Sequence, residues 1–323
     1  MTRLLDLLDP TLSPHATEAL AGRYRGAMLG LAAGNALGIP VEGFPRAFIA
    51  RLHAGGIREV ASAERERAWD DDLAQAALLA ESILERDACD PEDLAARFRT
   101  WRKESGRGVG YMTALVLDAH DAGVPVGDAA RQVWERADRN AAGNGAVMRC
   151  APVALRWRRD PERLVAETIR SAVVTHHDPR CGWSAVAVNI ALAGALADRR
   201  PDLPRLADVL EEAGAPKSVA DAVRACEEAS LDSLRLDHDN SMGYTLKAMQ
   251  VGLWAVTRRE GIEPILLAIV NAGGDTDTNA AVAGALLGAR DGADAVPDRW
   301  LQHIASIDRV TDLADRLLAR SDA

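Results

Sequence analysis

Two turns rich in aspartate carry the residue types that metal-ion or acid–base chemistry requires. The first, residues 69–76, reads WDDDLAQA and places three consecutive aspartates directly before an amphipathic segment. The second, residues 271–278, reads NAGGDTDT and leads into the apolar, alanine-rich segment 279–289. A lone acidic turn before a helix is usually a cap, because its side chain accepts free backbone N–H groups and complements the helix dipole.

Both turns hold more carboxylates than a helix cap requires. Adjacent aspartates repel one another, and the apolar residues that flank residues 70–72 indicate partial burial, which is unfavourable for ionised carboxylates unless they are paired. Two such turns, each opening onto an apolar helix, favour a shared cation site. Carboxylate and threonine oxygens are hard ligands, and no His or Cys accompanies them, so Mg²⁺, Mn²⁺ or Ca²⁺ fits better than zinc.

A glycine-rich turn over residues 142–152, AGNGAVMRCAP, is a candidate anion site. Asn-Gly turns tolerate positive φ angles, and free N–H groups at such a turn can hold an anion, to which Arg149 can add charge-assisted hydrogen bonds. The alternative is an ordinary turn between helices, with Pro152 at the start of the next helix. Because Gly-x-Gly turns are common, the residues alone favour the ordinary turn.

Two further segments place polar groups beside helices. Residues 175–178, THHD, contain paired histidines but lack the i, i+4 spacing of a zinc helix, which favours a polar turn over a metal site. Residues 26–38 form a helical segment with many Gly and Ala residues, and its simplest role is close helix packing. Glu42 follows that segment on a proline-containing loop.

Helical spacing of apolar residues dominates the chain and must supply the elements that position these turns. Leu20, Tyr24, Met28 and Leu31 recur at steps of three and four, and alanine, the strongest helix former, is abundant. Runs that alternate β-branched and aromatic residues are almost absent. We therefore predict an all-α fold. The predicted helices span residues 17–37, 73–84, 125–136, 161–174, 184–197, 203–213, 243–256, 264–270, 278–287 and 298–318.

Length, charge and cysteine content limit the class of protein. With 323 residues and no long linker, we predict one compact domain over residues 17–323, preceded by a surface extension over residues 1–16. The net charge of −10 disfavours binding to nucleic acid or to an anionic membrane, and no uncharged apolar stretch is long enough to span a bilayer. Four widely spaced cysteines without metal-type spacing fit a reducing compartment, so we expect a cytoplasmic protein.

Five blocks of the sequence, taken together and in order, resemble the ADP-ribosylglycohydrolase family, whose members include dinitrogenase reductase-activating glycohydrolase. The family patterns are G-x-x-L-G-x-A-x-G-D-A-L-G-x-P-x-E at residues 26–42, T-D-D-T at 70–73, G-N-G-A-x-M-R at 143–149, T-H at 175–176 and G-G-D-T-D-T at 273–278. Any one block is weak, whereas five collinear blocks are specific. The resemblance implies an all-α orthogonal bundle with two Mg²⁺ ions, or Mn²⁺ as the alternative, in a cleft that takes an ADP-ribose-containing substrate.

The resemblance also implies roles for individual residues. The implied metal ligands are Asp70, Asp71, Asp72, Asp275, Asp277 and Thr278. The implied substrate contacts, which include the segment that holds the diphosphate of ADP-ribose, are Asn144, Gly145, Ala146, Met148, Arg149, His176 and Gly274. Glu42 matches a loop glutamate with a role in catalysis, and Asp72 or Asp277 can take a proton from the attacking water.

Three residues depart from the family pattern. Asp70 and Leu73 stand where the family usually has threonine, and Asn35 replaces the aspartate of G-D-A-L-G. Asp70 can still bind a cation and adds a negative charge, which we expect to tighten cation binding and to disfavour a diphosphate. Leu73 cannot coordinate a metal ion. We expect these changes to affect the substrate more than the metal centre.

The implied activity is hydrolysis of the glycosidic bond at the anomeric carbon of ADP-ribose, in an ADP-ribosylated protein or a small conjugate. Two alternatives stay open. The first is a metal-dependent N-ribosyl hydrolase of a nucleoside or nucleotide conjugate, which the altered positions Asp70 and Asn35 suggest. The second is a non-catalytic ADP-ribose-binding relative. The retained acidic pairs argue against it, because an inactive protein has no need to keep their mutual repulsion.

Overall fold

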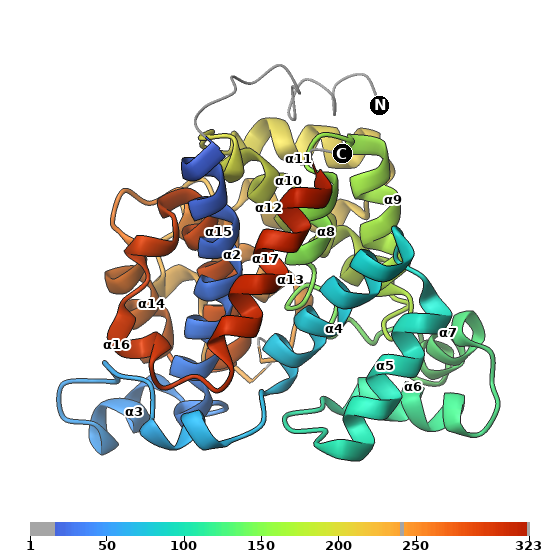
Figure 1. The fold of residues 1–323 in the computed structure, drawn as a ribbon, viewed down its shortest axis with the longest axis horizontal. Coiled ribbons are helices and arrows are strands. Elements are labelled where there is room, and N and C mark those ends of the chain that lie inside the picture. The colour runs from blue at the N-terminus through green and yellow to red at the C-terminus, as the bar shows by residue number, and fades with distance from the viewer. Residues whose placement is uncertain (1–16, 240–241, 322–323) are drawn as a thin grey trace.

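The described chain consists of α-helices and short 3-10 helices joined by turns (Figure 1). The computed structural model describes residues 17–239 and 242–321, and no β-strand occurs among them. The all-α prediction is therefore confirmed. The predicted extension over residues 1–16 lies outside the described residues. No helix in the described ranges is both long enough and apolar enough to cross a bilayer.

The elements follow one another along the chain as follows. The α-helices are α2 Thr17–Gly38, α3 Arg46–Leu52, α4 Asp71–Arg86, α5 Pro91–Glu104, α6 Tyr111–Asp121, α7 Val126–Arg136, α8 Ala151–Trp157, α9 Pro161–Ala172, α10 Pro179–Leu196, α11 Leu203–Glu212, α12 Lys217–Arg224, α13 Thr245–Val256, α14 Ile262–Asn271, α15 Thr276–Asp291, α16 Asp298–Leu301 and α17 Ile307–Ser321. The 3-10 helices are η1 Ile39–Val41, η2 Ser62–Glu66, η3 Asp232–Leu234 and η4 Ala293–Ala295.

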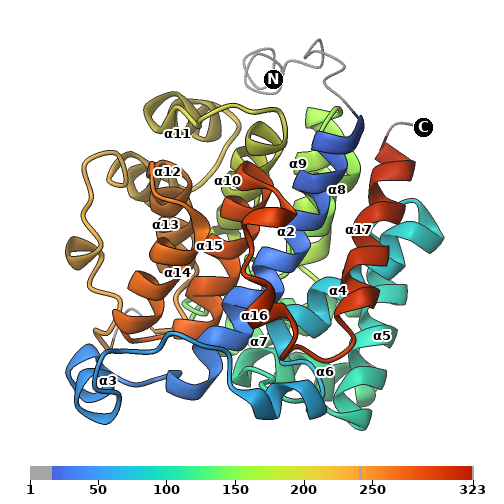
Figure 2. The ribbon, with the colours of Figure 1, turned by 60° about the vertical axis from the view of Figure 1, so that its left-hand side comes forward.

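Helices α2 and α15 lie against each other in the centre of the molecule, with α17 on the other side of α2 (Figure 2). The contact between α2 and α15 is backbone against backbone. A Cβ added at Gly30 would lie 2.1 Å from Gly284 O, and one at Gly34 would lie 2.0 Å from Ala280 O. Because such distances exclude a side chain, glycine at four-residue intervals on α2 permits this approach. The close packing expected for the Gly- and Ala-rich segment is confirmed.

The glycine contacts continue to the end of α2, where they place the second acidic turn. A Cβ at Gly38 would lie 2.4 Å from Asp277 Cα, and the Thr276 hydroxyl donates a 2.8 Å hydrogen bond to Gly38 O. The start of α15 is therefore fixed beside the end of α2. This contact also brings the acidic turn close to Glu42, which follows η1.

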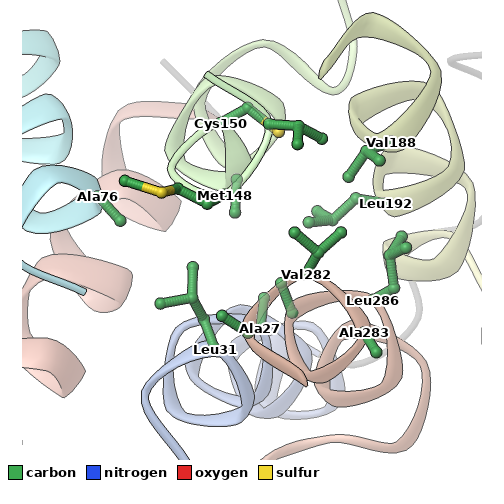
Figure 3. Close-up of a cluster of buried hydrophobic side chains, with 14 of the residues drawn as sticks. Ala27, Leu31, Ala76, Met148, Cys150, Val188, Leu192, Val282, Ala283 and Leu286 are labelled. Atoms are coloured by element: carbon green, nitrogen blue, oxygen red, sulfur yellow. The ribbon is translucent and has the colours of Figure 1, made fainter. Parts of the chain in front are cut away.

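Apolar side chains fill the space between the central helix pair, α10 and the segment before α8 (Figure 3). Ala27 and Leu31 of α2 and Val282 of α15 face Val188 of α10 across this cluster. Met148 and Cys150 close it from the segment that precedes α8, and their side chains are buried. The later residues of the glycine-rich turn are thus anchored in the core.

The predicted helix over residues 298–318 is wrong in one respect, because the structure divides it into α16 and α17. Helix α16 ends at Leu301, and Ser306, directly before α17, adopts the left-handed conformation with φ of 49°. Trp69 Nε1 donates a 2.6 Å hydrogen bond to Ala305 O, which holds this break against the residue that precedes the first acidic turn. Tertiary contact overrides the helical spacing here.

Candidate metal centre and substrate cavity

The two acidic turns meet in space. Asp70, Asp71, Asp72 and Asp277 each offer a carboxylate oxygen, and these oxygens lie within 4.8 Å of one another. Glu42, Asp275 and Asp277 form a second set that meets the same limit. Asp277 belongs to both sets, so the start of α4, the start of α15 and the loop after η1 converge on one place.

The aspartates of these turns do not act as ordinary helix caps. Asp70 and Asp275 occupy the N-cap positions of α4 and α15, yet neither side chain accepts a capping hydrogen bond. Other N-cap aspartates of the chain do accept backbone N–H groups from the first turn of their helices, namely Asp90, Asp160, Asp178 and Asp202. The N-cap aspartates of the two acidic turns therefore differ from the aspartates of this chain that cap helices.

Two carboxylate oxygens in the cluster are buried without a partner. Asp72 Oδ1 and Asp277 Oδ1 have no hydrogen bond within the described chain. Burial, followed by the charges of neighbouring aspartates, raises the pKa of Asp71, Asp72 and Asp277 well above the usual value. Because buried polar atoms are nearly always satisfied, these oxygens fit the donor set of a hard divalent cation such as Mg²⁺ or Mn²⁺.

Few protein donors compensate this negative charge. Asn35 Nδ2 donates to Asp72 Oδ2 at 3.2 Å, and the Thr278 hydroxyl lies 3.4 Å from the same oxygen. Arg107 Nε lies 3.8 Å from Asp70 Oδ1, and among the described residues this is the ion pair that the aspartates at residues 70–72 form. Within the described residues, Asn35 therefore donates a hydrogen bond at the position where the family pattern has another carboxylate.

Asp70, the carboxylate that the family pattern lacks, is paired with Arg107. A second acid, Glu64, holds Arg107 in place. Arg107 Nη1 donates to Glu64 Oε2 at 2.7 Å, and Glu64 is buried. Burial still raises the pKa of Asp70, and the Arg107 charge opposes that rise. Leu73, the other departure in this turn, is a buried core residue and lies outside both carboxylate sets.

A cavity of ≈ 300 Å³ opens beside the acidic turns. The residues expected from the sequence that line it are Glu42, Asp71, Asn144, Gly145, Met148, His176, Asp275, Asp277 and Thr278. Asp70 and Asp72 belong to the carboxylate cluster but not to the cavity wall. Ala146, Arg149 and Gly274 do not line the cavity, and all three are buried.

Gly274 supports the site by positioning the loop that carries Glu42. Its N–H donates to Phe44 O at 2.9 Å, and its carbonyl accepts from Gly43 N at 2.8 Å. Gly274 has φ of +82°, and an added Cβ would lie 2.0 Å from Leu236 O. The glycine is therefore required both by the backbone conformation and by the close approach of the neighbouring loop.

Glu42 lies at the mouth of the cavity and is exposed. Removal of water by the cleft walls, followed by the charges of Asp275 and Asp70, raises its pKa above the usual value. A glutamate with a raised pKa holds its proton to higher pH, which suits a group that donates a proton. The loop position expected from the sequence thus places Glu42 next to the acidic centre.

Sequence reasoning missed one segment of the cavity wall. Gly108, Gly110, Tyr111, Met112 and Thr113 line it. Gly108 has φ of +76°, and an added Cβ would lie 2.3 Å from Asp70 Oδ1, so the backbone passes directly over the cluster. The signal in the sequence was the run SGRGVG at residues 105–110, whose glycines permit such a path.

The comparisons with known proteins agree with this architecture. A sequence model of the ADP-ribosylglycohydrolase family matches residues 16–323. The chain is 27% identical over 328 residues to the ADP-ribosylarginine hydrolase Tri1 of Pseudomonas putida (strain GB-1), covering 96% of this chain and 81% of the relative. It is 26% identical over 300 residues to the ADP-ribosyl-[dinitrogen reductase] glycohydrolase of Rhodospirillum rubrum, covering 87% and 90%. A solved structure of an ADP-ribosylglycohydrolase-related protein complex matches with a TM-score of 0.76 and 32% identity, covering 94% of this chain and 99% of that one.

Proposed function

Because the chain belongs to the ADP-ribosylglycohydrolase family, we propose that it cleaves the glycosidic bond at the anomeric carbon of ADP-ribose in an ADP-ribosylated protein or small conjugate. Membership of the family makes the chain a glycosidic-bond hydrolase, so the family, the enzyme class and the fold expected from the five sequence blocks are confirmed. The choice of metal, linkage and catalytic residues belongs to the proposal.

The observation that carries the proposal is the pair of carboxylate sets that share Asp277. Asp70, Asp71 and Asp72 would hold one divalent ion together with Asp277. Asp275 and Asp277, with Thr278 beside them on the cavity wall, would hold a second. Mg²⁺ fits this all-oxygen donor set, and Mn²⁺ is the alternative.

The chain's own residues divide the remaining tasks. Bound divalent ions lower the pKa of water and fix the orientation of substrate oxygens. Both Asp72 and Asp277 have an unpartnered oxygen, and Asp277 is the better candidate for proton acceptor because it lines the cavity, whereas Asp72 is fully buried outside the lining. Glu42 at the mouth is the candidate that protonates the leaving group. The carboxylates would stabilise the positive charge that develops at the anomeric carbon.

We propose arginine-linked ADP-ribose as the first conjugate to test. The name of the Pseudomonas putida relative, an ADP-ribosylarginine hydrolase, supports this choice. Glu42 lines the cavity of ≈ 300 Å³ and is exposed, so a leaving group attached to a protein could extend outward beside it. Asn144 and Gly145 would lie along the ADP-ribose moiety.

The assay is release of free ADP-ribose from a panel of ADP-ribosyl-arginine, O-acetyl-ADP-ribose and simple nucleosides, with Mg²⁺ and with EDTA. We expect turnover of the first substrate that EDTA abolishes and Mg²⁺ restores. Full turnover in EDTA excludes the metal mechanism. Cleavage of simple nucleosides alone establishes the N-ribosyl hydrolase alternative, and calorimetric binding of ADP-ribose without turnover of any conjugate establishes the non-catalytic one.

Asp275→Asn tests the acidic turn with little change in shape. We expect turnover to fall by more than about 100-fold, because outer partners of metal ligands alone contribute factors of that order. The helical circular dichroism signal should stay the same. Asp202→Asn, at an ordinary N-cap, is the matched control and should retain full turnover. Equal turnover in both variants removes Asp275 from the mechanism.

A further inference from the structure

Arg149 is fully buried, and the hydrogen bonds of its two Nη atoms are all made to the protein, while the buried Nε has no partner among the described residues. Nη1 donates to Gln75 Oε1 and to Gly145 O, both at 2.7 Å. Nη2 donates to Ser171 O at 3.2 Å and to Thr175 Oγ1 at 2.7 Å. Each of the four Nη hydrogens thus has a protein acceptor. The guanidinium has none of these hydrogens to offer a diphosphate, contrary to the role that the sequence resemblance implied.

The Thr175 hydroxyl stands between Arg149 and His176. Its oxygen accepts from Arg149 Nη2 and lies 2.8 Å from His176 Nδ1. If Nδ1–H donated to this oxygen, the single hydroxyl hydrogen would have no acceptor among the described residues, although Thr175 is only 2% exposed. If the hydroxyl donates to Nδ1, all three groups are satisfied. Since buried polar groups are nearly always satisfied, the Thr175 hydroxyl donates to His176 Nδ1. The ring proton therefore lies on Nε2.

The Nε2 side of the His176 ring faces the cavity. His176 lines the cavity together with Gly143 and Gly145. Nε2 lies 3.0 Å from the position that a Cβ on Gly143 would take and 3.2 Å from the corresponding position on Gly145. The two glycines therefore leave space beside this atom. Nε2 makes no hydrogen bond to any group in the described ranges.

The charge state of His176 agrees with this arrangement. Burial, followed by the nearby Arg149 charge, lowers the pKa of His176 to about 3, and Asp178 opposes the shift only in part. The ring is neutral at physiological pH. A neutral ring has one N–H donor and one lone pair, and Thr175 occupies the lone pair.

We propose that Arg149 and Thr175 are positioning residues that hold His176 as the Nε2–H tautomer, so that the ring gives a neutral hydrogen-bond donor to an oxygen of the bound substrate. The proposal rests on the proposed function only for the identity of that substrate, an ADP-ribose conjugate with phosphate and hydroxyl oxygens. Because Nδ1 is occupied, His176 does not act as a general base. Proton acceptance is left to the carboxylates.

The tautomer can be measured directly on the full chain without substrate. Long-range ¹H–¹⁵N correlation spectra of protein labelled with ¹⁵N-histidine report which ring nitrogen carries the proton. The chain has 7 histidines, and comparison with His176→Gln assigns the signals of His176. We expect Nε2 to be protonated and Nδ1 unprotonated at neutral pH. A proton on Nδ1, or a charged ring, overturns the proposal.

Thr175→Val removes the hydroxyl and keeps a similar shape. We expect this variant to show a mixture of both tautomers, and to bind free ADP-ribose in Mg²⁺ about two- to tenfold more weakly, which corresponds to one neutral hydrogen bond. Thr175→Ser keeps a hydroxyl and should restore both the single tautomer and the affinity. An unchanged tautomer in Thr175→Val overturns the role of Thr175, and failure of Thr175→Ser to restore it does the same.

Thr257→Val is the matched control. Its hydroxyl is also buried beside an arginine: Arg258 Nη2 donates to Oγ1 at 3.1 Å, and Oγ1 donates to Trp254 O at 2.7 Å. Thr257 does not line the cavity, so neither the tautomer nor the ADP-ribose affinity should change. If wild-type protein binds no ADP-ribose, the proposed function fails. The ¹H–¹⁵N spectra of the chain without substrate test the tautomer independently of ADP-ribose binding.

Discussion

Asn144 joins the glycine-rich turn to the second acidic turn. Its side-chain amide donates a 2.6 Å hydrogen bond to Asp275 Oδ2, from a position 131 residues away in the chain. The backbone N–H of Gly243 donates to the same oxygen at 2.9 Å. Both donors use Oδ2. The two hydrogen bonds hold the Asp275 carboxylate in one orientation beside the acidic centre.

Asn144→Ala should therefore weaken cation binding even though Asn144 is not an expected ligand. Loss of an oriented partner of a metal ligand lowers metal affinity by about 10- to 100-fold. Calorimetric titration with Mg²⁺ measures this change. Asn189→Ala is a control, because Asn189 is buried and donates to Thr168 Oγ1 instead. Equal Mg²⁺ affinity in wild type and Asn144→Ala would show that the contact does not orient Asp275.

Asp70→Thr restores the residue that the family usually has and removes one carboxylate from the cluster. We expect Mg²⁺ affinity to fall by about tenfold or more, because a full charge acts over a short distance in a partly dehydrated site. The remaining Arg107 charge, held by Glu64, adds to the loss. Asp202→Thr is the matched control, since threonine can also serve as an N-cap there. A Mg²⁺ affinity equal to that of wild type contradicts a ligand role for Asp70.

The stability of the metal-free protein should depend on pH through the acidic centre. The pKa values of Asp71, Asp72 and Asp277 are raised in the folded state, so the folded protein binds more protons than the unfolded chain above the unfolded pKa of about 4. Their contribution to stability is fully present below that pH and is lost as pH rises through the folded values.

Thermal unfolding in EDTA from about pH 5 to pH 8 measures this contribution. We expect the midpoint of wild-type protein to fall with rising pH relative to an Asp72→Asn, Asp277→Asn variant, which lacks two of the titrating groups. Excess Mg²⁺ should remove the difference in slope, because cation binding stabilises the ionised carboxylates. Parallel curves in EDTA would contradict the raised pKa values.

The glycine contact between α2 and α15 should be sensitive to a single methyl group. Gly30→Ala places a Cβ 2.1 Å from Gly284 O, so the helices must separate, and we expect a loss of about 1–3 kcal/mol in the free energy of unfolding. Gly22→Ala, on the same helix with no atom within 4 Å, should instead stabilise by about 0.5–1 kcal/mol. Chemical denaturation measures both. Equal effects would show that the backbone contact is not tight.

The sequence predicted the parts of the fold and site that depend on local pattern. Helical spacing located most helices, and the many Gly and Ala residues of the segment that forms α2 indicated the close packing found against α15. The excess of aspartates at residues 70–72 and 275–277 indicated a cation centre. Helix α5 was missed although its signals were present: Asp90 is an N-cap that accepts two backbone N–H groups, and Pro91 follows it.

Features that depend on tertiary contact were not accessible from sequence. An arginine after a glycine-rich turn can point toward a ligand or into the core, and only the positions of Gln75 and Thr175 show that Arg149 does the latter. The segment between α16 and α17 is contacted by Trp69, which lies far away in the chain. The cavity wall at Tyr111 depends on how the segment before α6 crosses the acidic cluster.

The most direct test of the central claim is a calorimetric count of the divalent ions that one chain binds. Because Asp277 belongs to both carboxylate sets and Asp275 to only one, Asp277→Asn should lose both Mg²⁺ ions and Asp275→Asn should lose one of two. Wild-type protein that binds no divalent cation, or Asp277→Asn protein that still binds two, would contradict the account.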